Sequence, residues 1–275
     1  MDILSYFSAV PYTGGIGMCT LSALSLSPEQ QTWLDRLCAG ARSIAVVLFP
    51  YLVRDAGTLS LYARGMDYHT VIRDALQPVC DTLQRDFPEN QFVVLADSSP
   101  IPEVRAAWLS GAGILGSNGL IFDRKYGSFV FIGTVVTDLA CTPTASALER
   151  CPDCGACRRS CPAHALQESG QVDEAACFSA LTQSKQPLSE QQAQLLRAHP
   201  LIWGCDTCSL CCPLNRNAAE TQNPAFRMNR IHSLTAQQLD GLTRKQFLAA
   251  FPDRAFTWRG PAPLVRNLSL KHDET

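Results

Sequence analysis

The sequence predicts a mixed α/β (α+β) fold in three parts, and two observations predict it. Short apolar runs alternate with amphipathic helical patterns over residues 1–140, which is typical of helices packed on a sheet. Nine cysteines then fall between residues 151 and 212 and indicate a metal-binding module over residues 141–215. Residues 216–275 show helical periodicity again, so we expect a short C-terminal helical segment that packs back on the core.

The first part opens with a helix and a strand. Apolar residues recur at helical spacing over residues 28–41, and Ser27 before Pro28 is the expected N-cap. The unbroken apolar run SIAVVLFP at residues 43–50 predicts a buried strand. A second helix is expected over residues 69–87, with a kink at Pro78.

Two further strands complete the predicted sheet. QFVVLA at residues 91–96 and SFVFIGTVV at residues 128–136 are apolar, and a helix is expected between them over residues 101–110. A glycine-dense loop precedes the last strand. This density indicates close approach of the backbone, either to a ligand or to a neighbouring element, so Gly116 and Asn118 are candidate cofactor contacts.

After the predicted sheet, the sequence indicates a linker and two helices. Residues 142–148 link the sheet layer to the cysteine-rich module. Inside that module, residues 188–199 form a polar helical pattern, and residues 235–251 predict one C-terminal helix.

The first cysteine run, CPDCGACRRSCP, has the C-x2-C-x2-C-x3-C-P spacing that holds two iron-sulfur clusters. A tight turn directs three soft thiolates at one cube, and Pro162 turns the chain so that Cys161 reaches the second. By analogy with two-cluster ferredoxins, the module is ferredoxin-like. One 4Fe-4S cluster is then assigned to Cys151, Cys154, Cys157 and Cys212, and the other to Cys161, Cys177, Cys205 and Cys208.

The second run, CDTCSLCCP, has one cysteine fewer than the first. Cys177 fills that gap, and Cys211 is the expected non-ligand because Cys212 precedes Pro213. An exchange of Cys211 and Cys212 stays open. Disulfides suit a short secreted chain, and structural zinc leaves the third equally spaced cysteine and the C-P ending unexplained. The other cysteines are expected to be buried core thiols: Cys19, Cys38, Cys80 and Cys141.

Composition limits the partners. Residues 1–11 lack the basic and apolar regions of a signal peptide, and no stretch approaches the roughly 20 apolar residues of a bilayer span. We therefore expect a soluble, cytoplasmic protein with no membrane partner. The net charge of −2 gives no overall attraction to nucleic acid, yet the chain after Pro224 is basic and permits a polyanionic partner.

Residues 61–69, LYARGMDYH, place five functional groups at the start of a helix: Tyr62, Arg64, Asp67, Tyr68 and His69. Such a cluster could hold an anionic or amide-rich cofactor. The alternative is a solvated helix cap with a contact between Asp67 and Arg64.

Asp97 follows the strand at residues 91–96, where α/β sheets commonly present catalytic residues. An enclosed carboxyl there has a raised pKa and serves as a proton donor. Ser98 beside it is a candidate cofactor contact. The alternative is that Asp97 or Ser98 caps the next helix.

These residues carry a resemblance. The chain resembles the epoxyqueuosine reductase family, whose cobalamin-dependent, two-cluster members are related to reductive dehalogenases. The resemblance lies in YARGMDYH at residues 62–69, in residues 97–122 and 126–133, in both cysteine runs with CPLN at 212–215, and in residues 256–270. Two features depart from the family: fewer residues precede the strand at 43–50, and GILGSNG at 113–119 replaces a common Gly-Trp-x-Gly-Lys loop.

The resemblance implies that base-off cobalamin binds between an N-terminal cobalamin-binding layer and the cluster module. The two 4Fe-4S clusters would pass single electrons to it from an external one-electron reductant such as flavodoxin or ferredoxin, and Asp97 would match the general acid. The substrate would be epoxyqueuosine in a tRNA anticodon stem-loop, with the base extruded. Two alternatives are a paralogue with the same cofactors and another substrate, and an electron-transfer protein without a catalytic centre.

Overall fold

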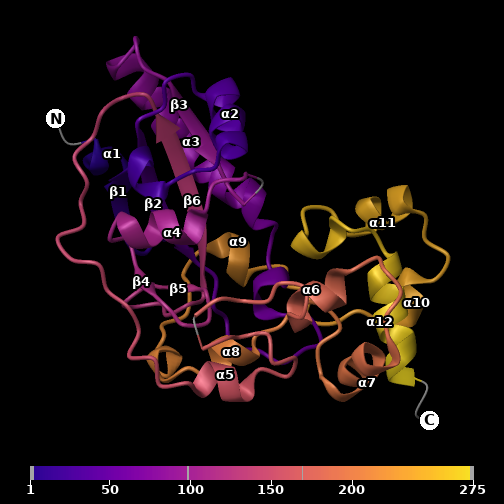
Figure 1. Ribbon diagram of the computed structural model, residues 1–275. Helices are drawn as coiled ribbons and strands as arrows, with labels where there is room; N and C mark the ends of the chain where they lie inside the picture. Colours follow the sequence, from indigo (N-terminus) through magenta and orange to yellow (C-terminus); the bar gives the residue numbers. More distant parts are fainter. Residues whose placement is uncertain (1–2, 98, 169, 273–275) are drawn as a thin grey trace.

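The computed structural model describes residues 3–97, 99–168 and 170–272. Ser98, one of the candidate cofactor contacts, lies outside these residues. A four-stranded sheet forms the centre of the N-terminal part (Figure 1). Its order is β1-β2-β6-β3, and the strands are β1 (Ile16–Thr20), β2 (Ser43–Pro50), β6 (Val130–Thr137) and β3 (Phe92–Leu95).

All three strand pairs of this sheet are antiparallel. The three predicted strands are confirmed, whereas β1 had no prediction because its five residues include a glycine and a threonine and show no long apolar run. The antiparallel pairing matters for Asp97. It follows the carboxyl end of β3, whose last residue, Leu95, pairs with Thr134 of the antiparallel β6 rather than with the carboxyl end of a parallel neighbour.

Both faces of the sheet are buried, which explains the unbroken apolar run of β2. Its side chains alternate between two cores: Ala45, Val47 and Phe49 pack on one face, and Ile44, Val46 and Leu48 pack on the other. Since neither face meets solvent, polar alternation is absent from the strand.

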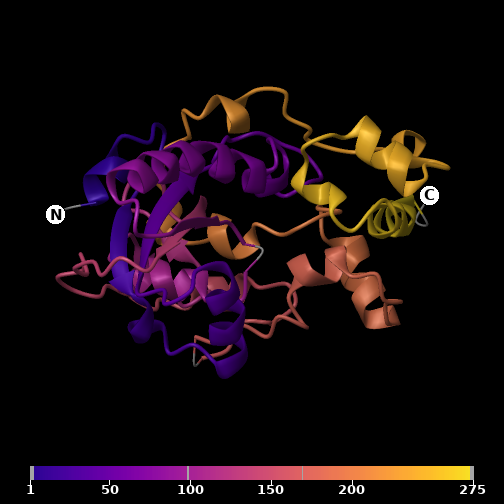
Figure 2. The same ribbon diagram turned by 90° about the horizontal axis from the view of Figure 1, so that it is seen from above.

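Helices cover both faces of the sheet (Figure 2). α3 (Tyr68–Asp86) and α1 (Leu4–Ser8) lie on one face, and α2 (Pro28–Leu37) and α4 (Glu103–Leu109) lie on the other. Gly133 in β6 is required for this packing, because a Cβ there would lie 2.8 Å from a methyl carbon of Ile72 on α3. The predicted cap of α2 is confirmed: Ser27 and Gln30 form a reciprocal capping box. α3 runs through Pro78.

A short hairpin follows α4. β4 (Ile114–Leu115) pairs with β5 (Ile121–Phe122), and the glycine-dense loop connects them. The cysteine-rich module then contributes α5 (Ala156–Ser160), α6 (Phe178–Gln183), α7 (Glu190–Ala198) and α8 (Thr207–Leu210). α7 confirms the helix expected over residues 188–199.

The C-terminal segment holds α9 (Pro224–Arg227), α10 (Ala236–Leu239), α11 (Arg244–Ala250) and α12 (Ala262–His272). The single helix predicted over residues 235–251 is wrong: Gly241 adopts a left-handed φ of 64°, and Thr243 caps a new helix after it. α12, which had no prediction, packs against α6 and α7 (Figure 1).

A separate core joins this segment to the rest of the chain. Trp203 is fully buried among Leu59, Phe247 and Phe256, so three distant parts of the sequence meet there. α9 returns to the sheet, where Phe226 packs on Phe131. None of the helices in the described ranges combines the length and apolar character that a membrane span requires.

Candidate functional site

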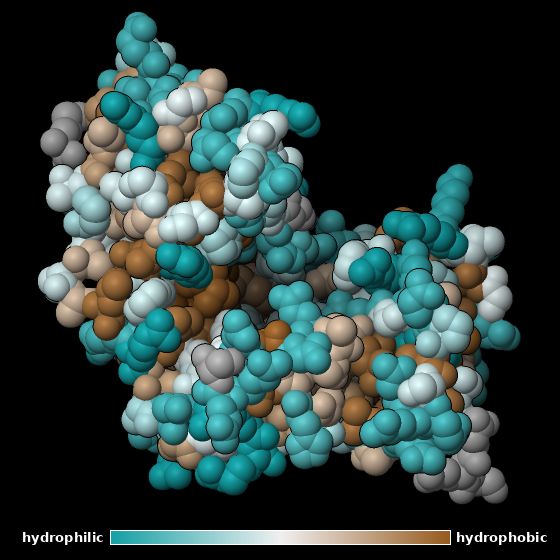
Figure 3. Space-filling view, viewed as in Figure 1, coloured by the Kyte–Doolittle hydropathy of each residue, from teal (hydrophilic) through white to brown (hydrophobic). Residues whose placement is uncertain are grey.

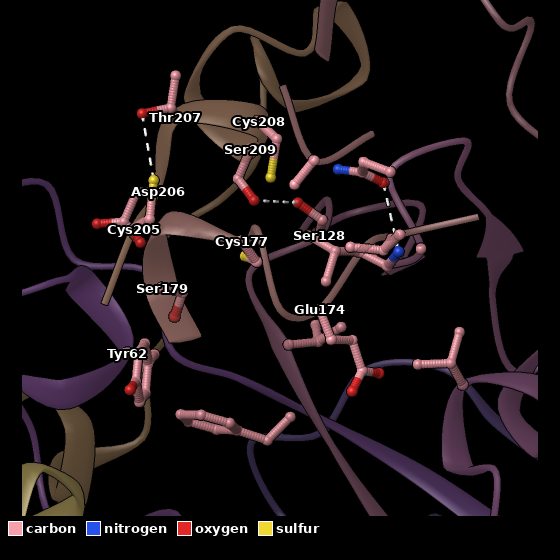
Figure 4. A pocket seen from close by; sticks show the side chains of 18 of the residues that line it. Tyr62, Ser128, Glu174, Cys177, Ser179, Cys205, Asp206, Thr207, Cys208 and Ser209 are labelled. Carbon is pink, nitrogen blue, oxygen red and sulfur yellow. Dashed lines mark hydrogen bonds between the residues drawn. The ribbon is translucent and has the colours of Figure 1, made fainter. Parts of the chain in front are cut away.

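A large cavity lies between the sheet layer and the cysteine-rich module and has a volume of about 720 Å³. Figure 3 shows the surface hollowed between these parts. The sheet side supplies Tyr51, Tyr68 and Phe131, and the module side supplies four cysteines: Cys161, Cys177, Cys205 and Cys208. Figure 4 shows Cys177, Cys205 and Cys208 near one another, with Tyr62 and Glu174 apart from each other below them.

A second, smaller cavity of about 100 Å³ lies within the module. Its wall contains the other four predicted ligands: Cys151, Cys154, Cys157 and Cys212. Among the described residues that form these two walls, Cys211 is absent from both. Its Sγ lies 3.6 Å from the carbonyl oxygen of Cys208 and donates to it. The two walls therefore contain the same two groups of cysteines that the analogy with two-cluster ferredoxins assigns.

Asn215 ties the second cysteine run to the sheet layer. Its Oδ1 accepts the Ser128 N–H at 2.8 Å, and its Nδ2 donates to the Ser128 Oγ and the Ser209 carbonyl at 2.7 and 2.8 Å. Asp206 makes a similar link, since it accepts from the Ser60 hydroxyl at 2.6 Å and the Leu61 N–H at 2.9 Å. These buried bonds hold Cys205 and Cys208 against the cavity.

Asp97 projects into the opposite side of this cavity from a loop with unusual backbone geometry. Its φ of 56° lies in the left-handed region, where aspartate is tolerated at some cost. The Asp97 N–H donates to Glu103 Oε1 at 2.9 Å. Because Glu103 opens α4, the helix fixes the conformation of the loop.

The carboxylate of Asp97 has two further partners. The Tyr68 hydroxyl donates to Oδ2 at 2.5 Å, and His69 Nε2 lies 3.4 Å from the same atom. On its other side, His69 Nδ1 lies 2.7 Å from Asp67 Oδ1. Tyr68 is held by stacking between His69 and Phe131, with ring centroids 4.1 and 4.3 Å away. A chain of polar groups therefore runs from Asp67 through His69 to Asp97.

This arrangement sets the protonation of each group. Burial acts to lower the pKa of His69, but its hydrogen bonds to Asp67 and Asp97 outweigh burial and raise that pKa to about 9. The hydrogen bond from His69 in turn lowers the pKa of Asp97. The raised pKa that was expected for Asp97 from the sequence is therefore wrong. Burial and the charge of Asp97 raise the pKa of Glu103 to about 7.

Only some of the predicted cofactor contacts line the large cavity. Tyr62, Tyr68, Asp97 and Asn118 line the large cavity, whereas Asp67 and His69 lie behind Asp97. Gly116 is absent from the described wall. A Cβ at Gly116 would lie 2.4 Å from the Phe122 ring, so its close approach is to a neighbouring element.

Arg64 does not reach this cavity. Its buried guanidinium donates to Asp55 Oδ1 at 2.5 Å and to the carbonyl oxygens of Asp55, Gly57 and Leu59. Of the alternative interpretation, the helix cap is confirmed, because Asp67 caps α3, whereas its contact between Asp67 and Arg64 is wrong, because Asp67 pairs with His69. Glu103 and Tyr51 were missed in the sequence; the only signal for Glu103 was its place in the predicted helix that follows Asp97.

The basic C-terminal segment is partly committed to internal contacts. Arg230 pairs with Asp55, and Arg254 and Arg266 donate to backbone carbonyls. Trp258 remains 52% exposed, with the Arg259 guanidinium 3.7 Å above its ring. Arg244, on the same part of the chain, is also exposed and reaches the Trp258 carbonyl at 3.4 Å.

Two family models match the chain. Residues 32–98 match a model described as "Epoxyqueuosine reductase QueG, DUF1730", and residues 150–215 match one described as "4Fe-4S double cluster binding domain". The second match shows that the cysteine-rich module binds iron-sulfur clusters, as its spacing predicts, rather than a structural zinc ion.

Curated relatives carry the name epoxyqueuosine reductase. The protein from Escherichia coli K12 is 31% identical over 288 residues, which cover 93% of this chain and 76% of that protein. The Listeria monocytogenes protein is 31% identical over 215 residues, or 77% of this chain. This chain spans only 55 to 60% of the length of the Listeria, Staphylococcus and Lactococcus relatives.

A solved structure has the same fold. It is a crystal structure of epoxyqueuosine reductase with an epoxyqueuosine-modified tRNA-Tyr stem loop, and it superimposes with a TM-score of 0.82. The match covers 98% of this chain and 79% of that one at 23% identity.

Proposed function

We propose that this chain, which belongs to the epoxyqueuosine reductase family, is an oxidoreductase that reduces epoxyqueuosine in tRNA to queuosine. One observation carries the proposal: Asp97 and four of the predicted cluster ligands line the same cavity. An electron-transfer protein without a catalytic centre would need no such cavity between Asp97 and the cysteines of the second set. The structure therefore favours an enzyme.

Two 4Fe-4S clusters fit the two cysteine sets. Each wall presents four thiolates, the donor number and type that such a cluster takes. Cys151, Cys154, Cys157 and Cys212 would hold the first cluster, and the set that borders the large cavity would hold the second. Electrons from a flavodoxin or ferredoxin would then enter at the first cluster and leave at the second.

We assign base-off cobalamin to the large cavity. Its wall combines apolar and aromatic side chains with several polar groups, as cofactor sites do. Tyr51, Tyr62, Tyr68 and Asn118 would contact the corrin, close to the second cluster. When bound, cobalamin supplies a reduced cobalt that acts as a strong nucleophile or electron donor.

The reaction requires two electrons and two protons, because the epoxide oxygen leaves as water and a carbon–carbon double bond forms. The residues around Asp97 would supply one of these protons at its Oδ2, and the second would come from solvent. His69 is protonated at neutral pH because its pKa is about 9, and it can pass a proton to the carboxylate that it contacts. Tyr68 orients that carboxylate, and Glu103 holds its backbone.

The tRNA stem-loop is supported as the substrate by the family and by the exposed group around Trp258. An exposed indole beside Arg244 and Arg259 suits stacking on a base and contact with phosphates. The departure at residues 113–119 supports a second candidate, a paralogue that uses the same cofactors on another substrate.

The test uses anaerobically reconstituted protein with cob(II)alamin, a chemical reductant and an epoxyqueuosine-containing tRNA stem-loop. Mass spectrometry of the nucleosides should show queuosine. Binding of cobalamin without conversion would transfer support to the paralogue. If cobalamin produces no change in its absorption or EPR spectrum on addition of protein, the assignment of the large cavity is wrong.

A further inference from the structure

We propose that Ser117 donates hydrogen bonds to sulfur at the first cluster and that Asn118 does so at the second. The Asn118 amide would thereby raise the reduction potential of the second cluster. This inference rests on the proposed cluster sites but not on the substrate or on cobalamin. It concerns the loop between β4 and β5, where the sequence departs from its family.

The backbone of this loop is fixed on both sides. The Gly116 N–H donates to the Leu120 carbonyl at 2.9 Å, and Gly119 turns the chain with a φ of 75°. β4 is joined to the first cysteine run, because the Cys151 N–H donates to the Leu115 carbonyl at 2.9 Å. The loop is therefore held against the cysteines by hydrogen bonds that do not involve their sulfur atoms.

Ser117 faces the first cysteine set. Its backbone nitrogen and its Oγ both lie 3.2 Å from the Cys151 Sγ. A cluster-bound thiolate has no proton to donate, so in the loaded protein both groups of Ser117 would donate to that sulfur.

Asn118 lies between the two sets. It is only 5% exposed, and it lines both the large cavity and the small one. Its Oδ1 accepts the Leu120 N–H at 3.3 Å, and this bond fixes which end of the amide is which. Within the described part of the chain, its Nδ2 has no hydrogen-bond partner.

A buried amide donor without a partner is costly, so its presence calls for an acceptor. Asn118 lines the large cavity together with Cys208, a predicted ligand of the second cluster. The sulfur atoms of a bound cluster, which carry negative charge, would supply the acceptor. This explains why a polar residue is buried between two otherwise apolar cysteine sets.

Hydrogen bonds to cluster sulfurs shift the potential in a known direction. Reduction adds an electron to the cluster, and a donor stabilises that added negative charge, so the potential rises. The Asn118 amide would therefore make the second cluster easier to reduce than it would be without this donor, which favours electron transfer toward the large cavity. Ser117 acts on the first cluster alone.

The test is an EPR-monitored redox titration of the reconstituted full chain without cobalamin or tRNA. Asn118→Leu keeps the volume of the side chain and removes the donor. We expect the second cluster to become about tenfold harder to reduce, a shift of about 59 mV to more negative potential for one electron. The neighbouring control, Ser117→Ala, should shift the first cluster and leave the second unchanged.

Iron and sulfide analysis separates this inference from the proposed function. If the wild-type chain does not take up two 4Fe-4S clusters, the proposed function fails. If both clusters form and the Asn118→Leu titration matches the wild type, only the inference is overturned. Should Asn118→Leu lose a cluster, Asn118→Asp has the same shape and replaces the donor with a carboxylate; it must also shift the second potential downward, and an unchanged potential would refute the donor role.

Discussion

The hydroxyl of Tyr68 donates to Oδ2 of Asp97 at 2.5 Å, although the two residues are 29 positions apart. Tyr68 begins α3, and Asp97 follows β3 in a left-handed conformation. Together they place a tyrosine and a carboxylate on the wall opposite the second cysteine set, and His69 lies behind Asp97. In the proposed reaction, protons from Asp97 and electrons from the second cluster would therefore reach the large cavity from opposite walls.

Replacement of Asp97 by asparagine should abolish proton delivery and keep the shape of the site. We expect the rate of queuosine formation to fall by about 10²- to 10⁴-fold, the usual contribution of a general acid or base. Single-turnover assays with the loaded protein would measure it. The EPR spectra of the clusters should not change, and activity within a factor of two of the wild type would exclude Asp97 as the acid.

The pair of His69 with Asp67 and Asp97 makes stability depend on pH. The folded pKa of His69, about 9, is higher than its ordinary value. Protonated His69 therefore stabilises the fold fully below about pH 6.5, and this contribution is lost as the pH rises through 9. Chemical unfolding from pH 6 to 10 should show a steeper loss of stability for the wild type than for His69→Gln. Parallel curves would contradict the assignment.

Cys211 and Cys212 should differ in iron binding. Cys211→Ser is expected to keep about eight irons per chain, and Cys212→Ser to lose the first cluster and keep about four. Iron analysis with EPR after reconstitution decides between the two. The reverse result would exchange the roles of these neighbours.

The Asp55 carboxylate forms ion pairs with the buried guanidinium groups of Arg64 and Arg230, whose side chains are 3% and 5% exposed. Asp55→Ala leaves both guanidinium groups without their anion and should cost about 3–5 kcal/mol of the unfolding free energy. Urea denaturation measures this cost. Glu190→Ala, which removes the exposed partner of Arg197, is the matched control and should cost less than about 1 kcal/mol.

Trp258 should contribute to tRNA binding. If a base stacks on its exposed ring, Trp258→Ala should weaken binding of the stem-loop by about 1–3 kcal/mol. Fluorescence anisotropy with labelled RNA measures the affinity. Tyr12→Ala changes a comparably exposed aromatic residue, 47% against 52%, and should leave the affinity unchanged. Equal affinities for both variants would remove Trp258 from the RNA surface.

Some of this protein could be predicted from the sequence because the signals are local. The spacing of Cys151, Cys154 and Cys157 reflects a single tight turn, and the apolar run of β2 reflects burial of both its faces. Ser27 and Pro28 mark the start of α2 for the same reason: the capping bond joins residues three positions apart.

Other features depend on contacts between distant residues, and sequence patterns do not encode them. Arg64 stands in a motif rich in functional groups, yet its charge is neutralised by Asp55 and by carbonyl oxygens outside that motif. The pKa of Asp97 is set by His69, which reaches it only because α3 packs beside the end of β3. The turn at Gly241 divided a continuous helical pattern because Leu239 and Phe247 must both reach the core around Trp203.

The sequence by itself determined the cluster chemistry, since the number and spacing of the thiols decide which metal groups they suit. Only the tertiary structure decided which cysteines share a wall and that Asp97 faces the second set. It also decided that Asn118 is buried between the two sets and that its Nδ2 has no hydrogen-bond partner among the described residues. The physical reason is that ligand type is a property of single residues, whereas burial, protonation and the direction of electron flow depend on which residues packing brings together.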